Sequence, residues 1–403
     1  MADDAQQPMP RVNSFKGLNN RIDPTRLGLE WQLQADNLLC DDAGYLVRRP
    51  GLQTLSAGLK DVYGRRDGRL LGVTTGDALV EISEDGAQTS LFVGMLGGPF
   101  QWTELGYAVF AMSETHAWAI YPNRLVSWGV PVCPPPSVSG DGGEFAYRIA
   151  CVYVASDGRQ GGTASLVTAY AGEWCGIFVT PPALAGYQTR TYASTPDGTE
   201  LYLANEGVIP FYLHALKRGV PLSTLHHYPP PLGGVIGDFH NRLAVGVWEP
   251  ELDRSVIYLS RIDNPHSFEL DSDFQIVAGR VTALASVPRA IIIGTDRAVY
   301  IDPIDEPVQR VAEYGVLPGG LVQDDRGVVE FWTQRGLCVA RPFKNLTDER
   351  MAVAVREKIT AAFWPWQGSQ YAVVAQQGPI VSKQRTRAHE PLSISTTYAQ
   401  GIT

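Results

Sequence analysis

Apolar residues along this chain occur in short runs that are β-branched or aromatic, and most runs end at a turn signal. Examples are residues 69–75 (RLLGVTT), 147–154 (YRIACVYV) and 256–260 (VIYLS). Asp-Gly, a dipeptide that tolerates the positive φ angles of tight hairpins, occurs five times. Short runs bounded in this way are typical of strands joined by hairpins, so the pattern predicts an all-β fold class.

Two stretches depart from the strand pattern and predict helices. In residues 348–362 the apolar side chains of Met351, Val355 and Ile359, together with the preceding Leu346, have the spacing of one helical face. Residues 25–39 give a weaker signal of the same kind.

One hairpin pattern recurs: an apolar strand, a hydroxyl residue, two turn residues, a small residue and a second apolar strand. It starts at Thr75, Thr295 and Thr333, with a looser copy at Ser113, and the spacings 75–113 and 295–333 are both 38 residues. A period near 40 built from several short strands is typical of one β-propeller blade. Hairpins near 75, 113, 245–258, 295, 333 and 371–381 predict six blades, and a seventh has room in residues 207–240.

The distance between the second and third copies is too long for whole repeats and indicates an insertion. Proline stretches at 131–136 and 229–231 flank a region with longer alternating strands. Consecutive prolines favour a stiff, extended backbone, so they suit linkers. We therefore expect an inserted fibronectin-like β-sandwich at 134–206. The predicted organisation has propeller parts at 13–133 and 207–382, a flexible segment at 1–12, and a C-terminal tail or arm at 383–403.

Charge and composition exclude several classes of protein. The 403 residues carry 33 basic and 42 acidic side chains, a net charge of −9, with no Lys/Arg-dense block. This balance argues against a protein that binds nucleic acid or an anionic membrane through a basic face. The first residues lack the pattern of a secretion signal, and no apolar run is long enough for a membrane span. Five scattered cysteines without a CxxC pair indicate free thiols in a reducing cytoplasm.

Catalytic and metal-binding motifs are missing from the sequence. No GxSxG, P-loop or HExxH pattern occurs, and His226-His227 stands beside a proline run without a third ligand at metal spacing. Asp271-Ser272-Asp273 lacks the glycine and final glutamate of a calcium loop. We expect no catalytic, metal or cofactor site and no enzymatic activity. A pair of carboxylates that meet in a propeller cavity, as in a polysaccharide-degrading enzyme, is the alternative.

Candidate assembly residues cluster near the two ends of the chain. Residues 13–24 mix apolar and polar side chains and are either an arm that docks on a neighbour or a strand that completes a blade. Arg48-Arg49 precedes a Pro-Gly turn, and the tail from 383 is basic and rich in Ser and Thr. The candidate assembly interface comprises Phe15, Leu18, Asn19, Arg21, Asp23, Arg48, Arg49, Lys383, Arg385 and Arg387.

Several passages, in this order, resemble virion proteins of tailed bacteriophages. The first are residues 13–24 (NSFKGLNNRIDP), 35–37 (ADN) and 42–51 (DAGYLVRRPG). Later ones are 145–162 (FAYRIACVYVASDGRQGG), 241–260 with Asn264-Pro265 and Phe268, 281–284 with 293–295, and 328–337. Each motif is weak alone, and their shared order covers most of the chain. The family comprises β-propeller proteins of the tail nozzle and tail hub.

The resemblance implies a structural role in a virion tail, assembled in the host cytoplasm. It implies a homo-oligomeric ring, six-fold or three-fold, that extends the DNA-exit conduit. The implied partners are adaptor or tube proteins, tail fibre, spike or plug proteins, and phage DNA in non-specific passage, without a membrane span. A receptor- or glycan-binding tail-tip protein, whose inserted sandwich contacts the host, is the alternative function.

Overall fold

The fold is built almost entirely of antiparallel strands. The computed structural model describes residues 16, 23–26, 28–31, 38–40, 46–48, 55–173, 176–214, 219–303, 306–323, 328–347, 359–366 and 369–376. The helical elements among these residues are two single 3-10 turns, η1 (Pro24–Arg26) and η2 (Pro250–Leu252). The chain forms two compact units, one from residues 56–277 and the other from residues 1–55 and 278–403.

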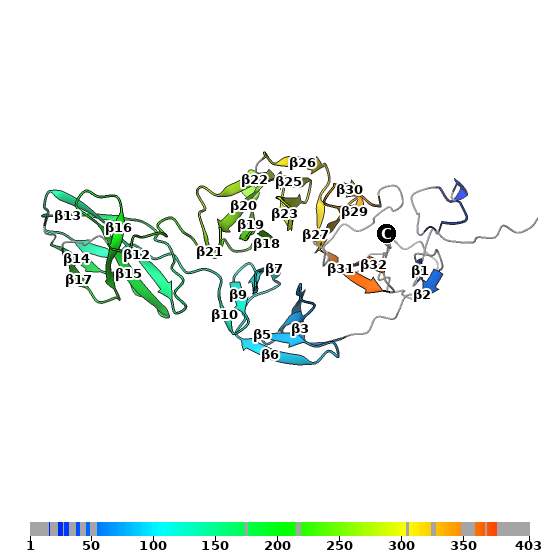
Figure 1. Ribbon diagram of the computed structural model, residues 1–403, viewed down its shortest axis with the longest axis horizontal. Coiled ribbons are helices and arrows are strands. Elements are labelled where there is room, and N and C mark those ends of the chain that lie inside the picture. The colour runs from blue at the N-terminus through cyan, green and yellow to red at the C-terminus, as the bar shows by residue number, and fades with distance from the viewer. Residues whose placement is uncertain are drawn as a thin grey trace, which may run out of the picture. The chain divides into compact units, whose positions relative to one another are not determined.

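The unit of residues 56–277 contains three sheets in which sequential strands pair as neighbours (Figure 1). Such meanders of four antiparallel strands are the blades of a β-propeller. The third sheet has an additional strand, β22, paired with β20. The strands are β3 (Leu59–Gly64), β4 (Leu70–Thr74), β5 (Ala78–Ile82), β6 (Gln88–Val93); β7 (Gln101–Leu105), β8 (Ala108–Met112), β9 (Ala117–Tyr121), β10 (Arg124–Ser127); and β18 (Val235–Phe239), β19 (Arg242–Glu249), β20 (Arg254–Arg261), β21 (Asn264–Phe268), β22 (Phe274–Ala278).

The other unit contains two more sheets of the same kind and two two-stranded sheets. The larger sheets are β23 (Val281–Val287), β24 (Ala290–Thr295), β25 (Val299–Pro303), β26 (Gln309–Ala312), and β27 (Val316–Gln323), β28 (Val329–Thr333), β29 (Gly336–Val339), β30 (Lys344–Asn345). The smaller ones are β1 (Leu38–Cys40) with β2 (Leu46–Arg48), and β31 (Ile359–Trp366) with β32 (Ser369–Gln376).

The second blade buries both of its faces against its two neighbours. In β8 all five residues are buried. Because side chains alternate along a strand, Val109 and Ala111 pack into the cluster shared with β4 and β5, while Phe110 and Met112 pack into the cluster shared with β18 and β19. A continuous apolar run is therefore needed in a strand between two blades.

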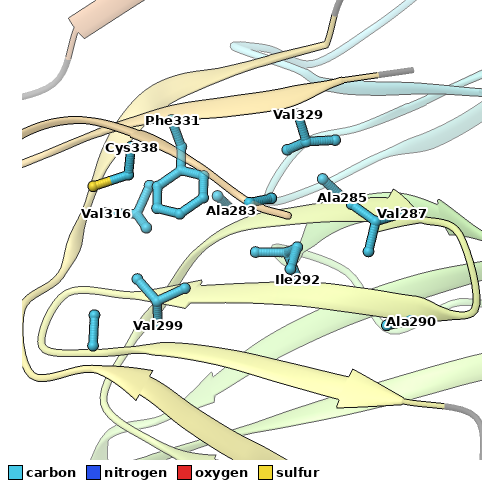
Figure 2. Close-up of a cluster of buried hydrophobic side chains, with 12 residues drawn as sticks. Ala283, Ala285, Val287, Ala290, Ile292, Val299, Val316, Val329, Phe331 and Cys338 are labelled. Atoms are coloured by element: carbon cyan, nitrogen blue, oxygen red, sulfur yellow. The ribbon is translucent and has the colours of Figure 1, made fainter. Parts of the chain in front are cut away.

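The same arrangement holds in the second unit. Figure 2 shows Ile292 and Val299 of one blade packed with Val329 and Phe331 of the next. First strands of successive blades lie side by side, as β7 does with β18, β23 with β27, and β27 with β31. Stacked four-stranded meanders with adjacent first strands form a β-propeller, so the all-β propeller prediction is confirmed.

The recurring hydroxyl residue caps the turn between the second and third strands of a blade. Thr295 Oγ1 accepts a hydrogen bond from the Ala298 amide at 3.0 Å and donates to the Ala298 carbonyl at 3.1 Å. Thr333 Oγ1 donates to the Gly336 carbonyl at 2.8 Å, and Ser113 Oγ accepts from the His116 amide at 3.0 Å. Such side-chain bonds satisfy backbone groups that the sheet leaves unpaired at a tight turn.

In the first blade the sequence repeat is displaced by one residue. The capping hydroxyl is that of Thr74, which accepts from the Ala78 amide at 3.1 Å, whereas Thr75 is exposed. The turn is therefore one residue longer, and Asp77 accommodates the additional residue by adopting the left-handed conformation, with φ of 61°.

Both expected helices are replaced by other structure where the residues are described. Residues 359–362 begin strand β31, which pairs with β32 along its whole length, and residues 348–358 lie outside the described residues. Ile359 is buried with Leu317 and Trp332, so burial against the neighbouring blade outweighs the helical spacing. Of residues 25–39, the described ones form the end of η1, a turn near residues 29–30 and the start of β1.

The insertion is a β-sandwich of seven strands in two sheets. One sheet has the order β11-β14-β17 and the other β13-β12-β15-β16. This is the architecture that fibronectin-like domains use. Its last strand lies beyond residue 206, so the module is longer than the sequence indicated. The strands are β11 (Ser137–Ser139), β12 (Phe145–Ala155), β13 (Val167–Ala171), β14 (Ile177–Thr180), β15 (Tyr187–Ser194), β16 (Leu201–Glu206) and β17 (Phe211–Leu213).

Candidate functional site at the base of the inserted sandwich

Three segments meet where the sandwich leaves the propeller blades, and we call them the neck: residues 128–133, 157–163 and 224–230. Their backbones touch through glycines that have no room for a side chain. A Cβ on Gly162 would lie 1.9 Å from the His227 carbonyl oxygen, and one on Gly129 would lie 2.7 Å from Pro230 Cδ. Cys133 pairs with Thr163 in a parallel bridge. The backbone of the sandwich loop is therefore packed directly on the linkers that lead to the blades.

An ion network fixes the tip of the β12–β13 loop to the second blade. Asp157 accepts from Arg159 Nε at 2.7 Å and lies 3.2 Å from Arg124 Nη1 on β10. Arg159 Nη1 also donates to the Ser127 carbonyl at 2.9 Å. Burial alone would raise the pKa of Asp157, but the hydrogen bonds and charge of Arg159, with the charge of Arg124, lower it below the usual range. The aspartate is thus ionised and paired at neutral pH.

His266 on β21 connects this network to the third blade. Its Nδ1 accepts from Arg159 Nη1 at 3.2 Å, because a guanidinium only donates. The neutral imidazole then carries its proton on Nε2, which lies 2.7 Å from the Tyr121 hydroxyl. Burial, followed by the charge of Arg159, lowers the pKa of His266 to about 4. This histidine is a neutral structural link at physiological pH.

A second polar group fixes the same loop to the returning linker. Gln160 Nε2 donates to Thr224 Oγ1 at 2.9 Å, and its oxygen accepts from the Tyr192 hydroxyl at 3.1 Å. Thr224 Oγ1 in turn donates to the Gly161 carbonyl at 2.7 Å. All three partners of this network are buried or half-buried, so it orders the linker against the sandwich.

The blade side of the neck is closed by Trp128. Its side chain is 1% exposed, and its Nε1 donates to the Pro265 carbonyl at 2.6 Å. Phe268, which packs on Trp128, exchanges backbone hydrogen bonds with Tyr228 at 2.8 and 3.0 Å. The linker after the sandwich therefore pairs with β21 as it returns to the third blade.

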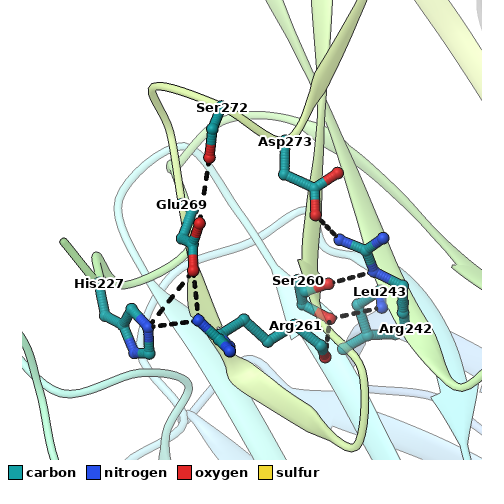
Figure 3. Close-up of polar contacts among 8 residues, drawn as sticks. All are labelled: His227, Arg242, Leu243, Ser260, Arg261, Glu269, Ser272 and Asp273. Carbon is teal, nitrogen blue, oxygen red and sulfur yellow. Dashed lines mark hydrogen bonds and ion pairs between the residues drawn. The ribbon is translucent and has the colours of Figure 1, made fainter. Parts of the chain in front are cut away.

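Figure 3 shows a polar cluster on the third blade beside the returning linker. Arg261 Nη1 donates to His227 Nε2 at 3.0 Å and pairs with Glu269, which also accepts from Ser272 Oγ at 3.1 Å. Burial, then the positive charge of Arg261, lowers the pKa of His227. The imidazole is consequently a neutral acceptor for the arginine.

Arg242 forms the other half of the cluster in Figure 3. Its guanidinium pairs with Asp273 and bonds the Ser260 carbonyl, and Ser260 Oγ accepts from the Leu243 amide at 2.9 Å. Asp273 is thus the partner of an arginine in this blade.

Two cysteines pack inside the sandwich end of the neck. Cys133 and Cys151 are fully buried with Val130 and Tyr153, and neither forms a disulfide. Burial raises the pKa of Cys133 to about 12 and that of Cys151 to about 11. Both thiols therefore stay protonated and act as small apolar groups.

The structure places two of the expected assembly residues. Asp23 is exposed, and its carboxylate accepts from Thr25 N at 2.9 Å and Thr25 Oγ1 at 2.7 Å, bonds that lower its pKa and start η1. Arg48 is exposed at the end of β2, opposite Leu38. The other eight lie outside the described residues: Phe15, Leu18, Asn19, Arg21, Arg49, Lys383, Arg385 and Arg387.

The described part of the chain contains no group of three or more His, Cys, Asp or Glu side chains arranged for a metal ion. It also contains no helix long and apolar enough to cross a bilayer. Asp157, Arg159 and His227 of the neck contact other side chains or the backbone.

No family model matches this sequence, and no curated protein matches it. Among solved structures, BamB from Moraxella catarrhalis is 12% identical over 69% of this chain and 81% of that one, with a TM-score of 0.24. PorZ of the Porphyromonas gingivalis type-IX secretion system is 11% identical over 78% of this chain and 45% of that one, with a TM-score of 0.22. Hsv2 from Kluyveromyces lactis is 8% identical over 79% of this chain and 90% of that one, with a TM-score of 0.33. At these scores the likenesses carry no argument about function.

Sequence reasoning did not foresee the neck as a site. Residues 145–162, Asn264-Pro265 and Phe268 carry the resemblance, and Asp157-Gly158 is one of the Asp-Gly turns, but no sequence pattern marks them as a contact between segments. The paired glycines 161 and 162 were the available signal, because adjacent glycines away from a hairpin tip often mark a close backbone approach.

Proposed function

We propose that this chain is a structural subunit of a bacteriophage tail, a nozzle or hub protein that forms an oligomeric ring. The observation that carries the proposal is where the phage-like passages fall. Residues 157–162 belong to the neck, and Pro265 and Phe268, far from them in sequence, bond to the other neck segments through Trp128 and Tyr228. The resemblance therefore involves residues that hold the sandwich on the propeller, which supports common architecture more strongly than shared strand composition does.

The fold suits a scaffold in a conduit. Blades buried on both faces are stiff, because close-packed interiors have low compressibility. The neck fixes the sandwich to two blades at once, so a force on the sandwich passes to the propeller. The net charge of −9 disfavours adhesion of DNA to the protein during ejection. In the proposed ring, one end of the subunit would contact adaptor or tube proteins. The other end would contact distal fibre, spike or plug proteins.

Electron microscopy of purified phage particles at side-chain resolution tests the proposal. We expect this chain as a closed ring around the tail axis, with the DNA path through the ring. Purified infectious particles that lack the chain would refute it. For the isolated chain, light scattering with and without the tail adaptor protein tests for ring assembly on a template.

A second function, receptor or glycan binding at the tail tip, is favoured by one feature of the sandwich. The outer face of its three-stranded sheet exposes an aromatic pair and has no charged residue. A ring subunit with such a face would be both conduit and contact with the host surface.

A further inference from the structure

The three-stranded sheet of the sandwich has two chemically different faces. Ile177, Val179 and Leu213 point into the core and are buried. The alternate residues face outward, and cross-strand register sets Ser139, Phe178 and Tyr212 in one row and Ser137 and Thr180 in the next. The outer face of this sheet is thus five positions, two aromatic and three with aliphatic hydroxyls.

The aromatic pair is held in place and open to solvent. The rings of Phe178 and Tyr212 are 5.0 Å apart at an angle of 54°, an arrangement that aromatic pairs favour. Tyr212 is 60% exposed, whereas Phe178 is half-buried beneath its neighbours. Strands on both sides of β14 fix the Cα position of Phe178, and pairing with β14 fixes that of Tyr212 on β17. The rings therefore form a preorganised platform whose exposed apolar area is available to a ligand.

The charges of the module define what that ligand is. None of the five outward residues is charged, although residues 137–213 include seven acidic side chains and three arginines. The acidic residues of the module would repel an anionic polymer, and the platform has no cation to compensate for that repulsion. A neutral ligand that presents apolar C–H groups to a ring and hydroxyl groups to Ser139 and Thr180 fits the pattern.

The small size of this face favours a sugar over a protein as its ligand. A stable protein interface uses roughly 20–30 residues on each side, far more than these five positions. One or two pyranose rings cover an aromatic pair and the hydroxyls beside it.

We propose that the outer face of the sheet β11-β14-β17 binds a neutral glycan, with Tyr212 and Phe178 as the stacking platform and Ser139 and Thr180 as hydrogen-bonding partners. Binding requires only the folded sandwich, so this inference is independent of ring assembly. A chain that assembles into rings without binding glycans, or binds glycans without assembling, would distinguish the two proposals.

Affinity electrophoresis of the full chain tests the inference. Native gels contain dextran, β-glucan, yeast mannan or galactomannan as neutral probes, and alginate or polygalacturonate as anionic ones. We expect at least one neutral polymer to retard the chain and neither anionic polymer to do so. Tyr212→Ala should weaken retardation about five-fold, the loss of one aromatic stacking contact.

Tyr170→Ala is the matched control, because Tyr170 is an equally open aromatic, 56% exposed, on β13 in the other sheet. It should retain full retardation, and both variants should keep the melting temperature of the unchanged chain. Retardation by no neutral polymer, retardation by the anionic ones alone, or equal loss in both variants would overturn the inference. Sedimentation velocity tests whether a second copy of the chain, instead of a glycan, occupies the face. Ile209, an apolar residue in the loop before β17, is 77% exposed. Self-association that is abolished by Tyr212→Ala or by Ile209→Ser would also overturn the inference.

Discussion

The tightest contact in the neck gives a sharp test of its rigidity. In Gly162→Ala the new Cβ would lie 1.9 Å from the His227 carbonyl oxygen and 2.8 Å from its carbonyl carbon. Both are backbone atoms, so the strain is not relieved by a change of rotamer. The linker of residues 224–230 must move away from the sandwich. Forced overpacking of this kind typically costs about 1–3 kcal/mol.

Hydrogen exchange measured by mass spectrometry reports this loss locally. A cost of about 1–3 kcal/mol corresponds to roughly 5- to 150-fold faster exchange in peptides covering 160–164 and 224–230. Exchange in the stacked blade strands β8 and β9 should be unchanged, because additional strain in the neck leaves their hydrogen bonds intact.

Gly172→Ala is the matched control. A Cβ at Gly172 meets no atom within 4 Å, and its backbone is outside the left-handed region. This variant should exchange as the unchanged chain does. If Gly162→Ala and Gly172→Ala behave alike in the neck peptides, the close approach of the two backbones is wrong, and so is the inference that the sandwich is rigidly held.

Three further outcomes are expected. Thr295→Val leaves the amide of the fully buried Ala298 without its acceptor and should lower the free energy of unfolding by about 1–3 kcal/mol. Thr75→Val, at an exposed position of the same sequence repeat, should change it by less than about 0.5 kcal/mol; urea titration compares the two variants. Asp157→Asn, which leaves Arg159 in the neck without its buried anionic partner, should destabilise the junction by about 3 kcal/mol, seen as faster tryptic cleavage in the linkers. The pKa of His266 is about 4 in the folded chain and near its ordinary 6.5 in the unfolded chain, so the unfolded chain binds the proton first as the pH falls. Protection of the neck amides from hydrogen exchange should therefore decrease between pH 6.5 and pH 4. His266→Gln should flatten that part of the pH profile.

Local patterns determined much of the fold. The period-two apolar runs, the Asp-Gly turns and the hydroxyl repeat encode strand, turn and blade, because each is an interaction between residues close in sequence. The hydroxyl of Thr333 closes a turn of four residues, which a sequence displays directly. The longer strands between the proline stretches likewise marked the inserted module, although β17 extends it beyond the expected end.

Contacts between distant segments decided the rest. Ile359 has helical spacing with Met351 and Val355, yet it lies in a strand because the neighbouring blade buries it. The neck joins Asp157, Arg124 and His266, which are separated by up to 142 positions in the sequence, and no local pattern specifies that pairing. Whether Tyr212 belongs to a core or to an open face was also undetermined until the register set it beside Phe178 on the outer side of the sheet. Sequence fixes what a strand can bury, and only the packed chain determines which residues it buries against and which it leaves exposed.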